Sequence, residues 1–237
     1  MSEPFTQFVT IPYITSQLLE EIHYKDVLIY AVLKSFKNNE TDLCCPSNEV
    51  VAKIANVGRN FVRQSLIRLE EAKLIFIDRS EKIKVVHHYH FARLNLYNRI
   101  PVGVLKANLT ANQKAILICL AQFFFGEGIR IPRNIKDKAN RLGMSYKMLY
   151  SQYIPLVEQG FIIETVRHYK FSDQSKIYHE LSDKFEWFYP PGVSEHYAAL
   201  NTQQREPCKF IMGEPFPLAH IELSAEVDKQ ANYLVLQ

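Results

Sequence analysis

The amino-acid sequence repeats one pattern of apolar residues at a fixed offset, and this internal repeat limits the folds open to the chain. Residues 24–36 align without gaps on residues 111–123, and both stretches have the apolar spacing of a buried helix. At the same offset of 87 positions, residues 52–77 overlie residues 139–164. An Ile-Pro pair precedes each copy, at positions 11–12 and 100–101. The sequence therefore predicts two copies of one folding unit.

The first copy has the pattern of a winged helix, in which three helices are followed by a hairpin. Ser47 is the expected N-cap of the second helix. We expect Gly58 to adopt a positive φ in the tight turn before the third helix. The expected elements are helices at about 24–37, from 47 onward and at about 60–73, and strands at 74–77 and 83–91.

The second copy repeats this order. Thr110 is the expected N-cap of its first helix, and Gly160 is the expected C′ residue of its third. Pro155 falls inside that third helix and removes a backbone donor, so we expect it to kink the helix or to shorten its first half. The expected elements are helices at about 110–125, 132–142 and 146–159, a short strand between the turn at 126–128 and the second of these helices, and strands at 161–166, 169–171 and 177–181.

The repeat predicts a helix-rich α+β fold with two tandem winged-helix domains, residues 1–98 and 99–189, and a tail, residues 190–237. The chain of 237 residues has a net charge of +3, but its tail holds three basic and six acidic residues. The remaining 25 basic and 19 acidic residues give residues 1–189 a net charge of +6, which favours a polyanionic partner. The acidic, proline-containing tail is either disordered or packs its apolar islands onto the body or a partner chain.

The third helix of the first copy carries side chains suited to reading DNA. In a helix-turn-helix this helix lies in the major groove with its N-terminal residues at the base edges. Arg matches guanine, and Asn or Gln matches adenine, through paired donors and acceptors. The residues of this copy predicted to contact DNA, wing included, are Ser47, Lys53, Arg59, Asn60, Arg63, Gln64, Arg68, Lys82 and Lys84. A solvated basic face, or a winged helix that binds protein, is the alternative.

The second copy gathers positive charge ahead of its third helix. That helix begins with Ser145, Tyr146 and Lys147, which suit phosphate contact better than base reading. The residues predicted to contact DNA in this copy are Arg130, Arg133, Lys136, Lys138, Arg141, Ser145, Tyr146, Lys147, Tyr150 and Ser151. The sequence leaves open whether this copy binds DNA or protein.

Motifs for catalysis are missing from the sequence. The chain has no GxxxxGK[ST], GxGxxG or GxSxG pattern, so we expect no enzyme and no cofactor. His88 and His90 share a strand face, but no nearby carboxylate or cysteine completes a ligand set, so we expect no metal site. No apolar run approaches the roughly 18–20 residues of a membrane span, and the N-terminus has no secretory pattern. Four cysteines without disulfide or zinc spacing favour the cytoplasm.

The segment PSNEVVAKIANVGRNFVRQSLIRLEEAKLI, residues 46–75, resembles the winged-helix DNA-binding segments of many bacterial regulators. With the lead-in FVTIPYITSQLLEEIHYKDVLIYAVL, residues 8–33, and a second, diverged winged helix, the chain is similar to the replication initiators (Rep proteins) of plasmids and phages. The resemblance covers about residues 8–185 in architecture and 8–78 in motif. It implies that the protein binds repeats in double-stranded DNA at a replication origin, recruits host replication proteins and represses its own gene as a homodimer.

Two other functions compete with replication initiation. A transcriptional regulator would use the same first winged helix and the second half for dimerisation. A non-catalytic tandem winged-helix adaptor of a chromosome-organising complex would bind protein and needs no basic reading helix, so the cluster from Arg59 to Arg68 favours DNA over this class. The sequence does not separate an initiator from a regulator.

Overall fold

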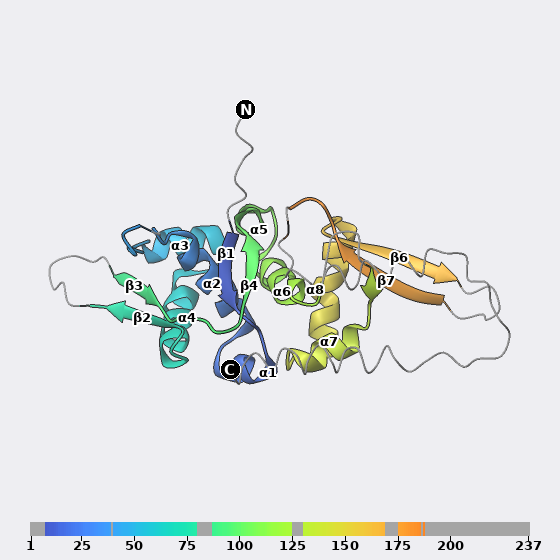
Figure 1. Cartoon of the computed structure of the whole chain (residues 1–237), viewed down its shortest axis with the longest axis horizontal. Helices are drawn as coiled ribbons and strands as arrows, with labels where there is room; N and C mark the ends of the chain where they lie inside the picture. Colours follow the sequence, from blue (N-terminus) through green and yellow to red (C-terminus); the bar gives the residue numbers. More distant parts are fainter. Residues whose placement is uncertain are drawn as a thin grey trace, which may run out of the picture. The chain divides into compact units, whose positions relative to one another are not determined.

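The computed structural model describes residues 8–38, 40–79, 87–124, 130–168, 175–185 and 187, which form eight helices and seven strands (Figure 1). All of them belong to one compact unit, residues 1–198. The order strand, four helices, two strands occurs twice, and the second series adds one short strand between its second and third helices. The origin of both series by duplication, and the boundaries at 98 and 189, stay predictions.

The first series contains the predicted helices and the first predicted strand, with ends shifted by at most two residues. The predicted second strand is described from His88 onward, and positions 83–86 lie outside the described residues. The elements are β1 (Phe8–Pro12), α1 (Ser16–Glu21), α2 (Tyr24–Ser35), α3 (Asn48–Ala55), α4 (Arg59–Glu71), β2 (Ile75–Asp78) and β3 (His88–Phe91).

The second series begins with β4 and has the predicted order, including the short strand before the helix predicted at 132–142, which is β5. The helix predicted at 132–142 starts too early, because Ile131 and Pro132 pair with β7 and the helix begins only at Ile135. The elements are β4 (Tyr97–Pro101), α5 (Val102–Lys106), α6 (Ala111–Ala121), β5 (Ile131–Pro132), α7 (Ile135–Arg141), α8 (Tyr146–Glu158), β6 (Ile162–His168) and β7 (Ser175–Leu181). The strand predicted at 169–171 lies outside the described residues.

Local signals at the ends of the second-series helices are confirmed. Thr110 caps α6 in a capping box with Gln113, because each side chain accepts a hydrogen bond from the other residue's backbone N–H. Gly160 follows α8 with a φ of 68°, which is the left-handed conformation expected of a C′ glycine. The helix runs from Tyr146 through Pro155 to Glu158, so the proline shortens neither half.

Two helices, α2 and α6, form the centre of the core and pack against each other. Val27–Leu33 of α2 and Ala115–Leu120 of α6 are fully buried. A helix that is apolar all round needs neighbours on every side, and α2 has them: α3 and α4, β1, and α6. In the described part of the chain, no helix is long and apolar enough to cross a membrane.

Strand pairing joins the two series. β1 and β4, which each end in an Ile-Pro pair, form an antiparallel ladder with Val9 opposite Ile100 and Ile11 opposite Asn98. The Gln122 side chain extends this contact, because its Oε1 accepts from the Ile14 N–H at 3.0 Å and its Nε2 donates to the Ile14 carbonyl at 2.8 Å. The hairpins that follow α4 and α8 form separate sheets, β2–β3 and β5–β7–β6.

Candidate nucleic-acid interface

The turn between α3 and α4 positions the candidate reading helix. The Ser47 Oγ accepts from the Val50 N–H at 3.3 Å, which confirms Ser47 as the N-cap of α3. The expected positive φ at Gly58 is wrong: Gly58 has a φ of −73° and is the N-cap of α4. The left-handed residue is Asn56, with a φ of 56° at the C-cap of α3, because an Asn side chain tolerates this conformation better than most others.

The outward face of α4 is polar and basic. Val62, Ser65, Leu66 and Leu69 are buried, as the predicted stripe requires. The side chains on the opposite face are exposed and lie in the first half of the helix, where a helix-turn-helix contacts base edges. These side chains are Arg59, Asn60, Arg63 and Gln64, and Ser47 and Lys53 of the preceding segment are exposed as well.

Arg59 already has an acidic partner. Its Nη2 lies 2.7 Å from Glu49 Oε1 of α3, in an ion pair whose two side chains are 62% and 69% exposed. An exposed pair of this kind stabilises a protein by about 0–1 kcal/mol, so a guanine edge or a phosphate can displace the carboxylate. Glu49 is the second residue of α3 and lies ten positions before Arg59 in the sequence.

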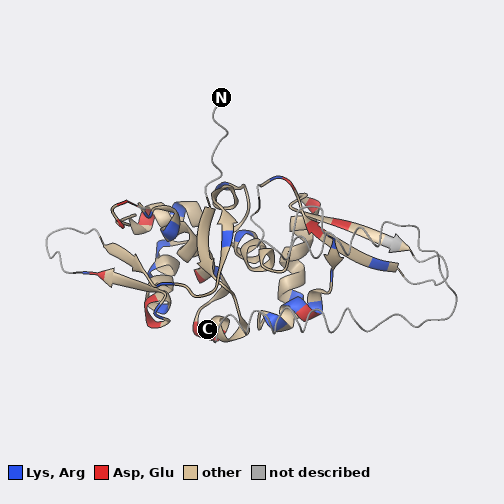
Figure 2. Ribbon diagram, viewed as in Figure 1, with Lys and Arg blue, Asp and Glu red and all other residues tan. Residues whose placement is uncertain are grey.

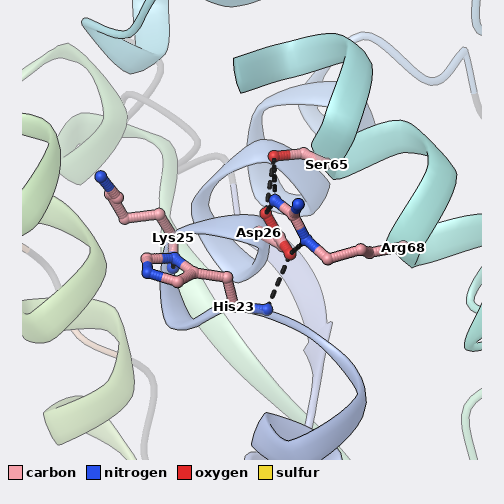
Figure 3. A network of polar contacts seen from close by, with 5 residues as sticks. All are labelled: His23, Lys25, Asp26, Ser65 and Arg68. Carbon is pink, nitrogen blue, oxygen red and sulfur yellow. Dashed lines mark hydrogen bonds and ion pairs between the residues drawn. The ribbon is translucent and has the colours of Figure 1, made fainter. Parts of the chain in front are cut away.

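Arg68 is placed differently from the other predicted contacts. Its Nε and Nη2 donate to the two carboxylate oxygens of Asp26, at 2.6 and 2.8 Å, and Asp26 is fully buried in α2 (Figure 3). Ser65 Oγ and the His23 N–H donate to the same carboxylate, at 2.6 and 2.8 Å. The hydrogen bonds that Arg68 donates to the Asp26 carboxylate raise the pKa of Arg68. The guanidinium of Arg68 therefore ties α4 to α2, and we leave it out of the proposed interface.

The predicted wing contacts lie beyond the end of β2. Lys82 and Lys84 lie outside the described residues. At the end of β2, Arg79 donates to both carboxylate oxygens of Glu70, at 2.9 and 2.6 Å, which connects the start of the wing to the last turn of α4.

The helix pair α7–α8 presents an exposed, partly aromatic end. Ser145 caps α8 by accepting from the Met148 N–H at 3.2 Å. Tyr146 is 50% exposed and stacks on Tyr150, with ring centroids 5.4 Å apart and planes 15° apart. Lys147 and Ser151 are exposed beside them. This arrangement offers one ammonium group and several hydroxyl groups to a phosphate.

Figure 2 shows Lys and Arg, in blue, along α7 ahead of α8. Most of the basic side chains in this part of the chain are engaged within the protein. Lys138 is buried, and its ammonium group donates to the carbonyls of Pro132 and Arg133, each at 3.1 Å. Burial lowers the pKa of Lys138 to about 8. The three arginines form ion pairs with acidic residues, and Lys136 is exposed; the pairs are Arg130–Glu180 at 3.4 Å, Arg133–Glu164 at 3.4 Å and Arg141–Asp137 at 3.1 Å.

A cysteine and a histidine also lie together next to α3. Cys45 Sγ is 3.3 Å from His88 Nδ1 of β3, although the two residues lie 43 positions apart in the sequence. Within the ranges that the structure describes, no three His, Cys, Asp or Glu side chains are grouped so as to hold a metal ion.

Comparison with known families agrees with the geometry of the first series. Residues 20–75, which include α2, α3 and α4, match the family model of a helix-turn-helix domain. This match supports a DNA-binding helix-turn-helix in that part of the chain. A search of curated proteins finds no match.

Proposed function

We propose that this protein binds double-stranded DNA in a sequence-specific way, with α4 in the major groove. The observation that carries the proposal is that α4 has one apolar and one polar face. The apolar face is buried against α2 and α3. The polar face is exposed near the N-terminus of the helix and carries Arg59, Asn60, Arg63 and Gln64. The helix-turn-helix match over residues 20–75 supports it independently. Arg63 is the strongest candidate for a guanine contact, because it is exposed in the middle of this face.

The finer part of the proposal is that the protein is a replication initiator of a plasmid or phage, which binds repeated sites at an origin. A second helix pair, α7–α8, supports this, because a chain with two DNA-binding surfaces can span two sites. The exposed end of α8, with Tyr146 and Lys147, is the part of the second series that suits phosphate contact.

A transcriptional regulator is the second candidate, and a specific observation favours it. Arg130, Arg133 and Arg141 are paired with carboxylates, and Lys138 is buried, so much of the positive charge of the second series is neutralised within the protein. A second half with little free charge fits a dimerisation module better than a second DNA-binding surface.

The coarse proposal is tested by an electrophoretic shift with DNA fragments selected from a genomic library by the full-length protein. Arg63→Ala should weaken specific binding by about 1–3 kcal/mol, and relax the preference at one base position, because a bidentate Arg–guanine contact is lost. Lys106→Ala, an exposed change on α5, is the matched control and should leave binding unchanged. If Arg63→Ala keeps the wild-type ratio between the affinity for selected fragments and the affinity for random fragments, base reading by α4 through Arg63 is refuted.

The same selected fragments separate the two finer candidates. An initiator should recover direct repeats, and the double change Tyr146→Ala and Lys147→Ala should shorten the footprint from two sites to one. A regulator that dimerises through its second half should recover inverted repeats whose half-sites lie about 10 base pairs apart or at multiples of this distance. For such a regulator the double change should leave the footprint intact.

A further inference from the structure

A solvent-open cavity of about 360 Å³ lies beside the C-terminal end of α2, away from the candidate reading helix. It is bordered by the C-terminal end of α2, by the segment that leads from β3 to β4, and by Thr10 of β1. No residue of α3 or α4 lines it. A volume near the lower end of the roughly 300–1,000 Å³ typical of ligand sites is enough for a small molecule.

The side chains around this cavity are basic and aromatic. Lys34, Lys37 and Arg93 contribute three positive charges, Phe91 and Tyr97 contribute two aromatic rings, and no described acidic residue lines the cavity. Lys37 has one neighbouring acid, because it forms an ion pair with Asp42, which lies outside the lining. Three cations in one concavity favour a ligand with more than one negative charge.

Lys34 is placed where a bound anion would stabilise its charge. Its ammonium group lies 4.2 Å from the centre of the Phe91 ring. Burial lowers the pKa of Lys34, and the nearby charge of Lys37 lowers it further. An anion between these two lysines would offset both the loss of water and the mutual repulsion.

The aromatic residues differ in what they can still contact. Phe91 already has Lys34 over its ring and the edge of Tyr30 against it, with ring centroids 5.4 Å apart. Tyr97 is 47% exposed, and the guanidinium of Arg99 lies 5.9 Å from its ring centre. Tyr97 is therefore the ring with surface left for a planar group of a ligand.

We propose that this cavity binds a nucleotide, with its phosphates on Lys34, Lys37 and Arg93 and its base against Tyr97. The site uses side-chain cations and not a glycine-rich loop, which is why no phosphate-binding motif marks it in the sequence. The proposal does not depend on the DNA-binding function, because its residues lie on different elements from the proposed DNA contacts in α3 and α4. The phosphate could belong to a free nucleotide or to the DNA backbone, and the experiment separates these two sources.

The test is isothermal titration calorimetry of the full-length protein with ATP, adenosine and tripolyphosphate. ATP should bind with one site per chain, and adenosine should bind at least tenfold more weakly, because it lacks the charges. Arg93→Ala should raise the Kd for ATP about tenfold, since a charge-assisted contact is lost. Tyr97→Ala should weaken the binding of ATP and leave the binding of tripolyphosphate unchanged. Lys106→Ala and Arg63→Ala are the controls, and neither should change ATP binding.

Arg93 is exposed, so the Arg93→Ala variant should unfold at the wild-type temperature, which makes its result interpretable. If the wild type does not bind ATP, and Arg93→Ala binds DNA more weakly and with a smaller salt dependence than the wild type, the cavity contacts a DNA phosphate and the free nucleotide is overturned. Absence of ATP binding with unchanged DNA affinity in Arg93→Ala would overturn the site altogether. Equal binding of ATP to wild type and Tyr97→Ala would overturn the role of the ring.

Discussion

Replacing Asp26 by alanine should lower the free energy of unfolding of this protein substantially, because the Asp26 carboxylate holds the candidate reading helix in place. The carboxylate is fully buried and accepts four hydrogen bonds, from the Arg68 Nε and Nη2, the Ser65 Oγ and the His23 N–H (Figure 3). Two of the donors are side chains of α4, while Asp26 itself lies in the first turn of α2. The network therefore connects α4 to the central helix of the core.

The magnitude follows from what each donor loses. The His23 N–H loses its capping-box partner, at a cost of about 1 kcal/mol, and the buried Ser65 hydroxyl is left without its acceptor, at a cost of about 1 kcal/mol or more. The Arg68 side chain is 30% exposed, so water can solvate part of its charge and the penalty stays below that of a fully buried ion. We expect a total of about 3 kcal/mol, which corresponds to a fall in Tm of roughly 6–12 °C for a protein of this size.

Urea unfolding of the full-length protein, followed by circular dichroism, measures this change. Glu20→Ala, which removes an exposed carboxylate from α1, is the control and should stay within about 0.5 kcal/mol of the wild type. The double variant Asp26→Ala with Arg68→Ala should lose less than the two single variants together, because the two groups interact directly. The assigned role of the network would be refuted if Asp26→Ala lowered the free energy of unfolding no more than Glu20→Ala does. It would also be refuted if the losses of the two single variants added up to that of the double variant.

Two further changes test the second series and its contact with the first. Burial lowers the pKa of His179 to about 2. In the unfolded chain the His179 side chain takes up a proton near pH 6.5, whereas in the folded protein it stays neutral. The free energy of unfolding should therefore fall by about 1.4 kcal/mol for each pH unit below pH 6.5. His179→Phe should remove this slope in urea unfolding at pH 7 and pH 5, and an unchanged slope would contradict the assignment. Lys114→Met should cost about 2 kcal/mol, because the Lys114 ammonium group donates to the carbonyls of Ile54 and Leu105, at 3.0 and 2.6 Å, and its loss leaves both unpaired. Thermal unfolding at neutral pH measures this effect, and a change below 0.5 kcal/mol would contradict it.

Local features of the fold were predictable from the sequence. Ser47, Thr110 and Ser145 each cap a helix, and Gly160 follows one with positive φ, because these residue types satisfy the end groups of a helix through bonds within three or four positions. The exposed set on α4 was also predictable, since it follows from the spacing of the buried stripe.

Partners distant in sequence were not predictable. Arg68 was expected to contact DNA because nothing near it in the sequence shows that Asp26 lies beside it in the core. Arg130 and Arg133 likewise pair with Glu180 and Glu164, which lie on strands that follow much later in the chain. Lys138 was expected at the surface because lysine is rarely buried. Its burial depends on the carbonyls of Pro132 in β5 and of Arg133, which accept from its ammonium group. Basic residues counted along a sequence therefore overstate the positive charge that a DNA-binding surface offers.

The second series contributes to the first helix-turn-helix through contacts that involve no DNA. The Lys114 ammonium group of α6 donates to the carbonyl of Ile54 near the C-terminal end of α3, where a positive charge also interacts favourably with the helix dipole. Tyr24 Oη donates to Asn112 Oδ1 at 2.9 Å and joins the starts of α2 and α6. The position of α3, and through the turn that of α4, thus depends on α6. A substitution in the second series can therefore change DNA binding by the first without lying in any DNA contact, so the effect of mutations there does not by itself show that the second helix pair touches DNA.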